Sequence, residues 1–123
     1  YKNCFKLLFA FCPTLQSAKN LILPATTLAG NCYYSMFQDC TNLTTAPELP
    51  ATILEDYCYH RMFYNCTKLN YIKALFTTTP SADYTSNWLY GVASAGTFVK
   101  NKNATWNVTG ASGVPSGWTV QTV

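Results

Sequence analysis

The chain has 123 residues, which is the size of one domain with one core. Hydrophobic residues make up 49% of it and charged residues only 11%, so the composition excludes a disordered, highly charged tail. The net charge of +3 is spread thinly, which argues against a nucleic-acid-binding face. The longest apolar run, Leu7 to Cys12, is far shorter than the roughly 20 residues of a membrane-spanning helix.

Six cysteines divide the first part of the chain into three related units. They are Cys4, Cys12, Cys32, Cys40, Cys58 and Cys66, three pairs with the same spacing. The units span about 3–30, 31–56 and 57–76 and share the pattern C-[YF]-x-x-[ML]-F-x-x-C-x-x-L, followed in the first two by L-P-A-T. Such a unit cannot bury its apolar face alone, so we expect residues 1–76 to form a solenoid of stacked coils.

Each unit is expected to hold a short helix and a short strand. Cys32, Met36 and Phe37 have helical spacing and would share one face of a short helical turn, which the third unit repeats. Strand-compatible segments follow the second cysteine of each unit, at 16–19, 44–47 and 70–73. Stacked about 4.8 Å apart, they would form a small parallel sheet. The sequence therefore predicts an α+β repeat solenoid.

Some positions differ so much between the units that no packed interior would accept them. They are Lys6, Tyr34 and His60 in one column, Leu7, Ser35 and Arg61 in a second, and Ala10, Gln38 and Tyr64 in a third. We expect these three columns to face solvent or a partner.

The composition changes from Thr77 onward, where the cysteine spacing stops and Thr, Ser, Gly and Asn become frequent. Ser81 is expected to cap a helix with apolar residues at roughly helical spacing, namely Tyr84, Trp88, Leu89 and Val92. The segments 97–100 and 118–123 alternate like strands. Residues 77–123 are therefore predicted to form an α/β cap over the open end of the last coil.

The tail contains three tryptophans, Trp88, Trp106 and Trp118. In one interpretation they seal the last coil, because a short cap needs large apolar side chains. In the other they are stacking platforms for sugars.

The run LPATTLAGNCYYSMFQDCTNLTTAPELPATILEDYCYHRMFYNCTKLNYIKAL closely resembles the BspA-like leucine-rich-repeat surface proteins of Bacteroides and related bacteria. The resemblance covers about residues 3–76, and the segment from Gly96 to the end looks like the closing segment of such chains. It implies leucine-rich-repeat-like coils, a location that is extracellular or on the outer surface of a bacterial cell, and a role in adhesion or ligand contact. No catalytic residue is carried over by the resemblance.

The role of the cysteines stays open between two structural alternatives. A zinc site would need closer pairs than these. A pair such as Cys32 and Cys40 could form a disulfide only if the helical turn ended by Phe37, because a helix of that length holds the Cα atoms about 12 Å apart. The extracellular location that the resemblance implies favours disulfides. The alternative is that all six are buried free thiols.

Catalysis is not expected from the residues present. His60 falls in an outward column and not beside a nucleophile. Among the carboxylates only Glu55 and Asp56 are neighbours, and on a turn their side chains point apart. No phosphate-binding loop or dinucleotide fingerprint is present. We therefore expect no enzyme activity, no cofactor and no metal ion.

Three functions are compatible with the sequence. The first is a non-catalytic surface protein that mediates adhesion or binds a protein or other ligand. Its binding strip would lie across the strand segments, at Gln16, Thr44, Asn70, Tyr71 and Lys73. The second is a structural subunit or tip of a surface fibre or phage appendage, and the third is a carbohydrate-binding module that uses the tail tryptophans.

The partner would be a host or microbial surface protein or glycan, with no nucleic acid and no membrane span. The first unit opens at Asn3 without a polar cap. We therefore expect its N-terminal end to continue into further repeats or to pack on another subunit.

Overall fold

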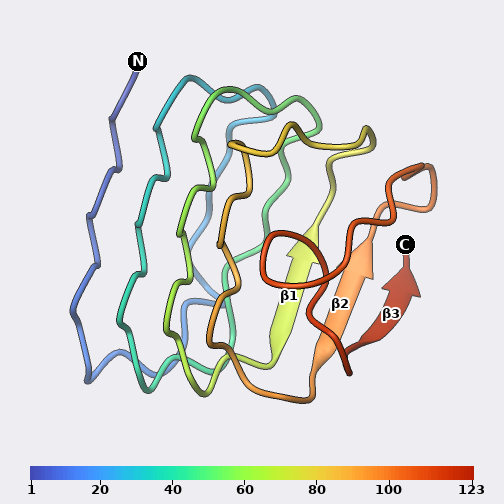
Figure 1. The fold of residues 1–123 in the computed structure, drawn as a ribbon. Coiled ribbons are helices and arrows are strands. Elements are labelled where there is room, and N and C mark those ends of the chain that lie inside the picture. Colours follow the sequence, from blue (N-terminus) through green and yellow to red (C-terminus); the bar gives the residue numbers. More distant parts are fainter.

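The computed structural model describes residues 1–123. It contains three short strands, β1 (Tyr71–Ala74), β2 (Thr97–Lys100) and β3 (Thr119–Thr122), and no helix. The strands form one parallel sheet in the order β1-β2-β3. Figure 1 shows the chain passing from the N-terminus to the C-terminus through successive layers that lie side by side.

Away from the sheet, four segments of the chain run next to one another. We call them the first to fourth ribbons, residues 3–11, 31–39, 57–65 and 83–91. Alternate residues donate their backbone N–H to the next ribbon, as Phe5 does to the carbonyl of Cys32 at 2.9 Å and Tyr33 does to that of Cys58 at 3.1 Å. The residues between them donate to the carbonyl three positions earlier, as Leu8 does to Phe5. Each of the first three ribbons is therefore a series of turns whose outward N–H groups donate to the ribbon that follows it in the sequence.

The expected α+β solenoid with short helices is wrong. Backbone angles in the left-handed region recur at every fourth position of a ribbon, for example at Asn31 (φ 58°), Ser35 (φ 50°) and Asp39 (φ 59°). A right-handed helix cannot contain such residues, so neither the turn predicted at 32–37 nor the helix predicted from Ser81 forms. Because the ribbon also repeats every four residues, it produces the same apolar spacing that suggested a helix.

The leucine-rich-repeat and solenoid assignments are contradicted for the same reason. The structure has no helices, and its regular structure is limited to three strands of four residues each. Most of the chain is held instead by hydrogen bonds between turns and loops.

The sheet extends past its three strands as single bridges. Ser17 pairs with Thr45 and Thr45 pairs with Tyr71, both in parallel, and Tyr71 then pairs with Thr97 in β2. The strand predicted at 97–100 forms as β2, and the one predicted at 118–123 forms over a shorter range as β3. The expected alternation between core and solvent is absent, because Phe98 and Val99 are both buried in β2 and all four residues of β3 are exposed. The segment predicted at 70–73 forms one residue later as β1, whereas 16–19 and 44–47 contribute only bridges.

The core is a single cluster of buried residues, and two columns of stacked rings run from it to the first ribbon, where Phe5 is exposed and Phe9 is partly buried. One column is Phe5, Tyr33 and Tyr59, with centroids 5.8 and 6.1 Å apart, and the other is Phe9, Phe37 and Phe63, with centroids 5.4 Å apart at both steps. Buried residues on both sides of the predicted boundary at residue 76 belong to this cluster.

Candidate functional site

The strip predicted on the strand side is brought together by the backbone. The N–H of Thr44 donates to the carbonyl of Gln16 at 2.8 Å, and the N–H of Asn70 donates to that of Thr44 at 3.1 Å. Tyr71 follows at the start of β1 with its side chain exposed. Lys73 is paired with Glu48, with Nζ and Oε2 3.1 Å apart. The backbone thus places the five residues in three adjacent layers, with Gln16, Asn70 and Tyr71 exposed and Thr44 and Lys73 half-buried.

All six cysteines are free thiols in the structure. Two of them donate across the layers, since Sγ of Cys40 lies 3.0 Å from the carbonyl oxygen of Phe9 and Sγ of Cys66 lies 3.0 Å from that of Phe37. Cys4 is exposed and Cys12 is partly exposed, whereas the other four are buried. The four buried thiols fill the core, and those of Cys40 and Cys66 also satisfy carbonyl groups of the neighbouring ribbon.

Burial also makes these thiols poor nucleophiles. It raises the pKa of Cys58 from 9.0 to about 12 and raises the pKa of Cys66 further above its usual range. The cause is the same in both: a thiolate loses its hydration inside the core. Because the thiolate is the reactive form, the buried cysteines have a structural role.

The three tryptophans of the tail are also buried, and each indole N–H has a partner. Nε1 of Trp88 donates to the carbonyl of Gly113 at 3.0 Å, and Nε1 of Trp106 donates to that of Phe76 at 3.0 Å. Trp118 donates to Ala93 at 2.7 Å. Their rings pack in the core, so they offer no open ring face for stacking on a sugar.

A second set of outward side chains lies on the ribbons. Tyr34 stacks on His60 with ring centroids 4.7 Å apart, and Tyr64 stacks on Tyr90 with centroids 4.9 Å apart. A cationic group lies over one ring of each pair. Nζ of Lys6 is 4.6 Å from the centroid of the Tyr34 ring, and the guanidinium carbon of Arg61 is 5.1 Å from the centroid of the Tyr64 ring. We call these six residues the ladder face.

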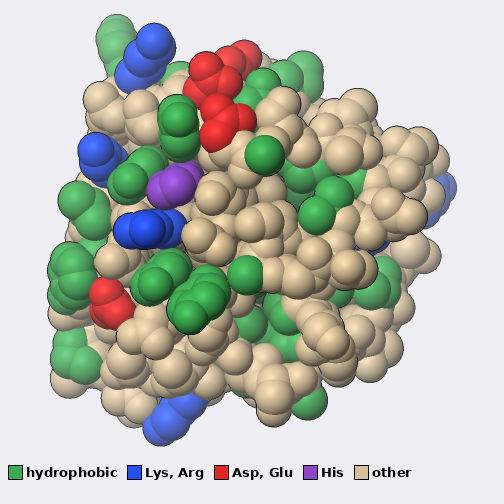
Figure 2. Space-filling model, in the orientation of Figure 1, with side chains coloured by type: hydrophobic (Ala, Val, Ile, Leu, Met, Phe, Trp, Pro, Cys, Tyr) green, Lys and Arg blue, Asp and Glu red, His purple; other side chains and the backbone are tan.

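Figure 2 shows this side of the molecule, where the one histidine lies among basic and hydrophobic side chains, with a group of carboxylates at the upper edge and one more apart at the left. Burial, and then the charge of Arg61, lowers the pKa of His60. Its Nδ1 is enclosed without a hydrogen-bond partner. The imidazole is therefore held mainly by its ring contacts and favours the neutral form.

The outward columns were predicted only in part. Lys6 is exposed as expected, whereas Tyr34 and His60 are half-buried. Ser35 is only 1% exposed, because its short side chain does not reach past the neighbouring ribbons. Tyr90 was missed. Its ribbon has no cysteine pair, so the repeat gave no signal there.

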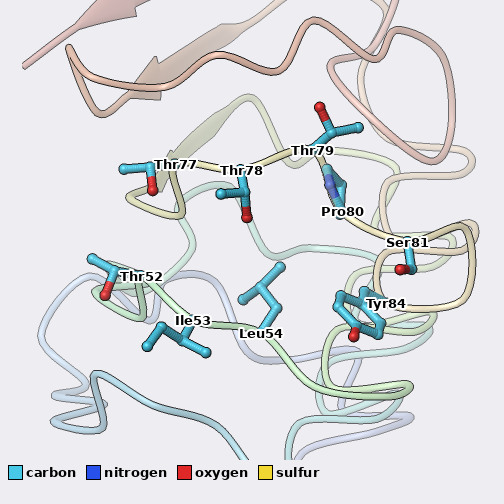
Figure 3. A pocket seen from close by; sticks show the side chains of 9 residues that line it. All are labelled: Thr52, Ile53, Leu54, Thr77, Thr78, Thr79, Pro80, Ser81 and Tyr84. Atoms are coloured by element: carbon cyan, nitrogen blue, oxygen red, sulfur yellow. The ribbon is translucent and has the colours of Figure 1, made fainter.

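A groove of about 420 Å³ lies between the segments 52–54 and 77–81. No charged side chain lines it. Its hydroxyl-bearing residues are Thr52, Thr77, Thr78, Thr79, Ser81 and Tyr84, and its apolar residues are Ile53, Leu54 and Pro80. In Figure 3 the hydroxyls of Thr77 and Thr78 point toward the segment 52–54, whereas that of Thr79 points away. No pattern in the sequence predicted this groove.

No family model, no curated protein and no solved structure matches this chain. The resemblance to the BspA-like family therefore stays a prediction.

No three His, Cys, Asp or Glu side chains lie close enough together to hold a metal ion. No helix with the length and apolar character needed to span a bilayer occurs in the structure.

Proposed function

We propose that this chain is a non-catalytic binding module that mediates adhesion or protein contact at the outer surface of a bacterial cell. The observation that carries the proposal is the ladder face, where two aromatic pairs, each covered by a cation, stand on the surface of the ribbons. Tyr90 is 51% exposed and the other three rings are half-buried, so a partner would cover apolar ring surface that is open to solvent.

The composition of the ladder face fits a protein partner. Tyr and Arg are enriched among the residues that contribute most to protein–protein binding, because each combines a large apolar area with hydrogen-bonding capacity. Tyr64 and Tyr90 are held by stacking on each other, and Arg61 lies over Tyr64. These side chains therefore lose little conformational entropy when a partner binds.

The test is a binding panel of purified surface and matrix proteins together with immobilised glycans. We expect wild type to bind at least one protein on the panel. The double variant Tyr64→Ser, Tyr90→Ser should weaken that binding at least tenfold, as expected for the loss of aromatic anchors. The matched control is Tyr71→Ser, which removes an exposed tyrosine from the strand-side strip. A blank panel, or equal loss from both variants, would contradict the proposal.

A carbohydrate ligand is the second candidate, and the groove favours it. Neutral sugars are bound by hydroxyl and amide groups beside apolar patches. The groove offers several hydroxyls, an apolar wall at Ile53 and Leu54, the ring of Tyr84, and no charge. The variant Thr78→Val with Tyr84→Ala should then abolish signals on the glycan part of the panel and leave the protein signals unchanged.

A further inference from the structure

A second pocket adjoins the groove that lies between the segments 52–54 and 77–81. It has a volume of about 390 Å³ and shares Pro80 and Ser81 with the groove. The groove extends from these two residues toward the segment 52–54, whereas the second pocket extends toward Val108 and Ser112. Figure 3 shows Pro80 and Ser81 at one end of the groove. One extended ligand could therefore occupy the groove and the second pocket at the same time.

The second pocket is polar but carries no charge. Its hydroxyl-bearing residues are Ser81, Thr85, Ser86 and Ser112, and its other residues are Pro80, Ala82 and Val108. The hydroxyls of Ser81 and Ser86 form no hydrogen bond within the protein, whereas those of Thr85 and Ser112 bond to the backbone. Two hydroxyls are thus free to bind a ligand.

The backbone adds a buried donor to the second pocket. In the fourth ribbon the N–H groups of Asn87 and Leu89 point away from the third ribbon and donate to Oγ of Ser112 and to the carbonyl of Ala111, both at 3.0 Å. Thr85 comes two residues before Asn87, so the alternation of the ribbon directs its N–H to the same side. This N–H has no partner within the protein, although Thr85 is only 2% exposed. A buried donor without a partner is costly, so an acceptor atom of a ligand would be favoured there.

We propose that the groove and the second pocket together bind a neutral oligosaccharide, with one sugar unit in each and the linkage crossing Pro80 and Ser81. This inference rests on the carbohydrate-binding role proposed for the groove. Sugar hydroxyls both donate and accept hydrogen bonds, so they match the free serine hydroxyls and the N–H of Thr85. No cation lines the groove or the second pocket, so the carboxylate of an acidic sugar would lose its hydration without gaining a partner.

The first test compares ligands of different length and charge on the full chain by isothermal titration calorimetry. The neutral probes are malto-, cello-, manno- and N-acetylchito-oligosaccharides of one to four units. We expect at least one series to bind, with an affinity that rises at least tenfold from the monosaccharide to the disaccharide. Oligomers of galacturonic acid should bind at least tenfold more weakly than that disaccharide.

A variant that blocks only the second pocket tests the location. Ala82 is exposed and lines the second pocket but not the groove, so Ala82→Trp should fill the pocket without disturbing the core. The disaccharide should then bind to within about twofold of the monosaccharide, and the affinity for the monosaccharide should not change. Ala95→Trp is the matched control, because Ala95 is also exposed and lines neither site.

The amide resonance of Thr85 gives a direct readout of the buried donor by NMR. It should shift when the disaccharide binds and stay unchanged with the monosaccharide, whereas the amide of Leu89, which is already bonded to Ala111, should not shift with either.

The outcomes separate this inference from the role proposed for the groove. Monosaccharide binding that is lost in the Thr78→Val, Tyr84→Ala variant, but with no gain from chain length and no effect of Ala82→Trp on the disaccharide, would overturn the two-unit site alone. Tighter binding of the galacturonic acid oligomers would overturn the neutral ligand class. Absence of binding by every neutral series at about 10 mM would overturn both this inference and the carbohydrate role of the groove.

Discussion

The ring of His60 lies nearly flat on the ring of Tyr34, with centroids 4.7 Å apart and planes inclined by 19°. Its Nδ1 has no partner, so the ring contact matters more than the imidazole nitrogens. We expect His60→Phe to keep the free energy of unfolding and His60→Ala to lower it by about 1 kcal/mol, the usual worth of an aromatic pair. Urea unfolding of both variants checks this. An equal loss of unfolding free energy in the two variants would show that a ring nitrogen of His60 makes a stabilising hydrogen bond.

The buried thiols and tyrosines predict a loss of stability at high pH. Burial raises the pKa of Cys58 from 9.0 to about 12 and that of Tyr33 from 10.0 to about 12. The unfolded chain therefore releases these protons at lower pH than the native chain, which favours unfolding as the pH rises from 9 to 12. For Cys58 the slope approaches about 1.4 kcal/mol per pH unit, and for the less buried Tyr33 it is smaller.

Urea titrations between pH 7 and pH 11 measure this slope. Cys58→Ala should lower the stability at pH 7 and also flatten the decline above pH 9, because the titrating group is gone. A wild-type profile that stays level through pH 11 would contradict the burial of these groups.

The left-handed backbone positions predict a stabilising substitution. Leu7 has φ 60°, a strained conformation for a residue with a Cβ. Its side chain is 44% exposed, so burial of the side chain offsets little of this strain. Asn tolerates the left-handed region better. Leu7→Asn should therefore raise the free energy of unfolding by about 0.5–1 kcal/mol. Leu8→Asn is the control, because Leu8 is similarly exposed but has no positive φ. A gain from both variants would trace the effect to polarity alone.

Three segments of the chain approach closely at Gly96, so a substitution there should be strongly destabilising. A Cβ at Gly96 would lie 2.6 Å from the carbonyl oxygen of Asn70 and 2.7 Å from Cε2 of Trp118. Neither the backbone nor the packed indole can move freely, so Gly96→Ala should cost about 2 kcal/mol or more. Gly110→Ala is a useful comparison. Its Cβ would meet no atom within 4 Å, although its φ of 95° adds strain. Thermal melting ranks the two, and a milder effect at Gly96 would contradict the packing at the edge of β2.

The sequence predicted the short strands and the positions whose side chains differ most between the units. Thr, Phe and Val at 97–99 are residue types that favour strands, and the segment 97–100 forms β2. The column of Lys6, Tyr34 and His60 was correctly kept out of the buried core, although only Lys6 is exposed and the other two are half-buried. The helices were wrong because a spacing of four residues is shared by helices and by ribbons with a left-handed residue at every fourth position.

Two features of the site could not be predicted, for different reasons. Tyr90 belongs to a ribbon that lacks the cysteine pair, so nothing local aligns it with Tyr64. The groove is formed by two segments that meet only after the layers stack, at 52–54 and 77–81. Such a site depends on long-range placement and leaves no motif in the sequence.

The most direct test of the account is an NMR titration with the panel protein that binds most tightly, following the ring resonances of the tyrosines and of His60. The ladder face predicts that the signals of Tyr64, Tyr90 and His60 shift or broaden first, while those of Tyr71 on the strand side stay unchanged. Shifts confined to Tyr71, with the ladder face unaffected, would contradict the central claim.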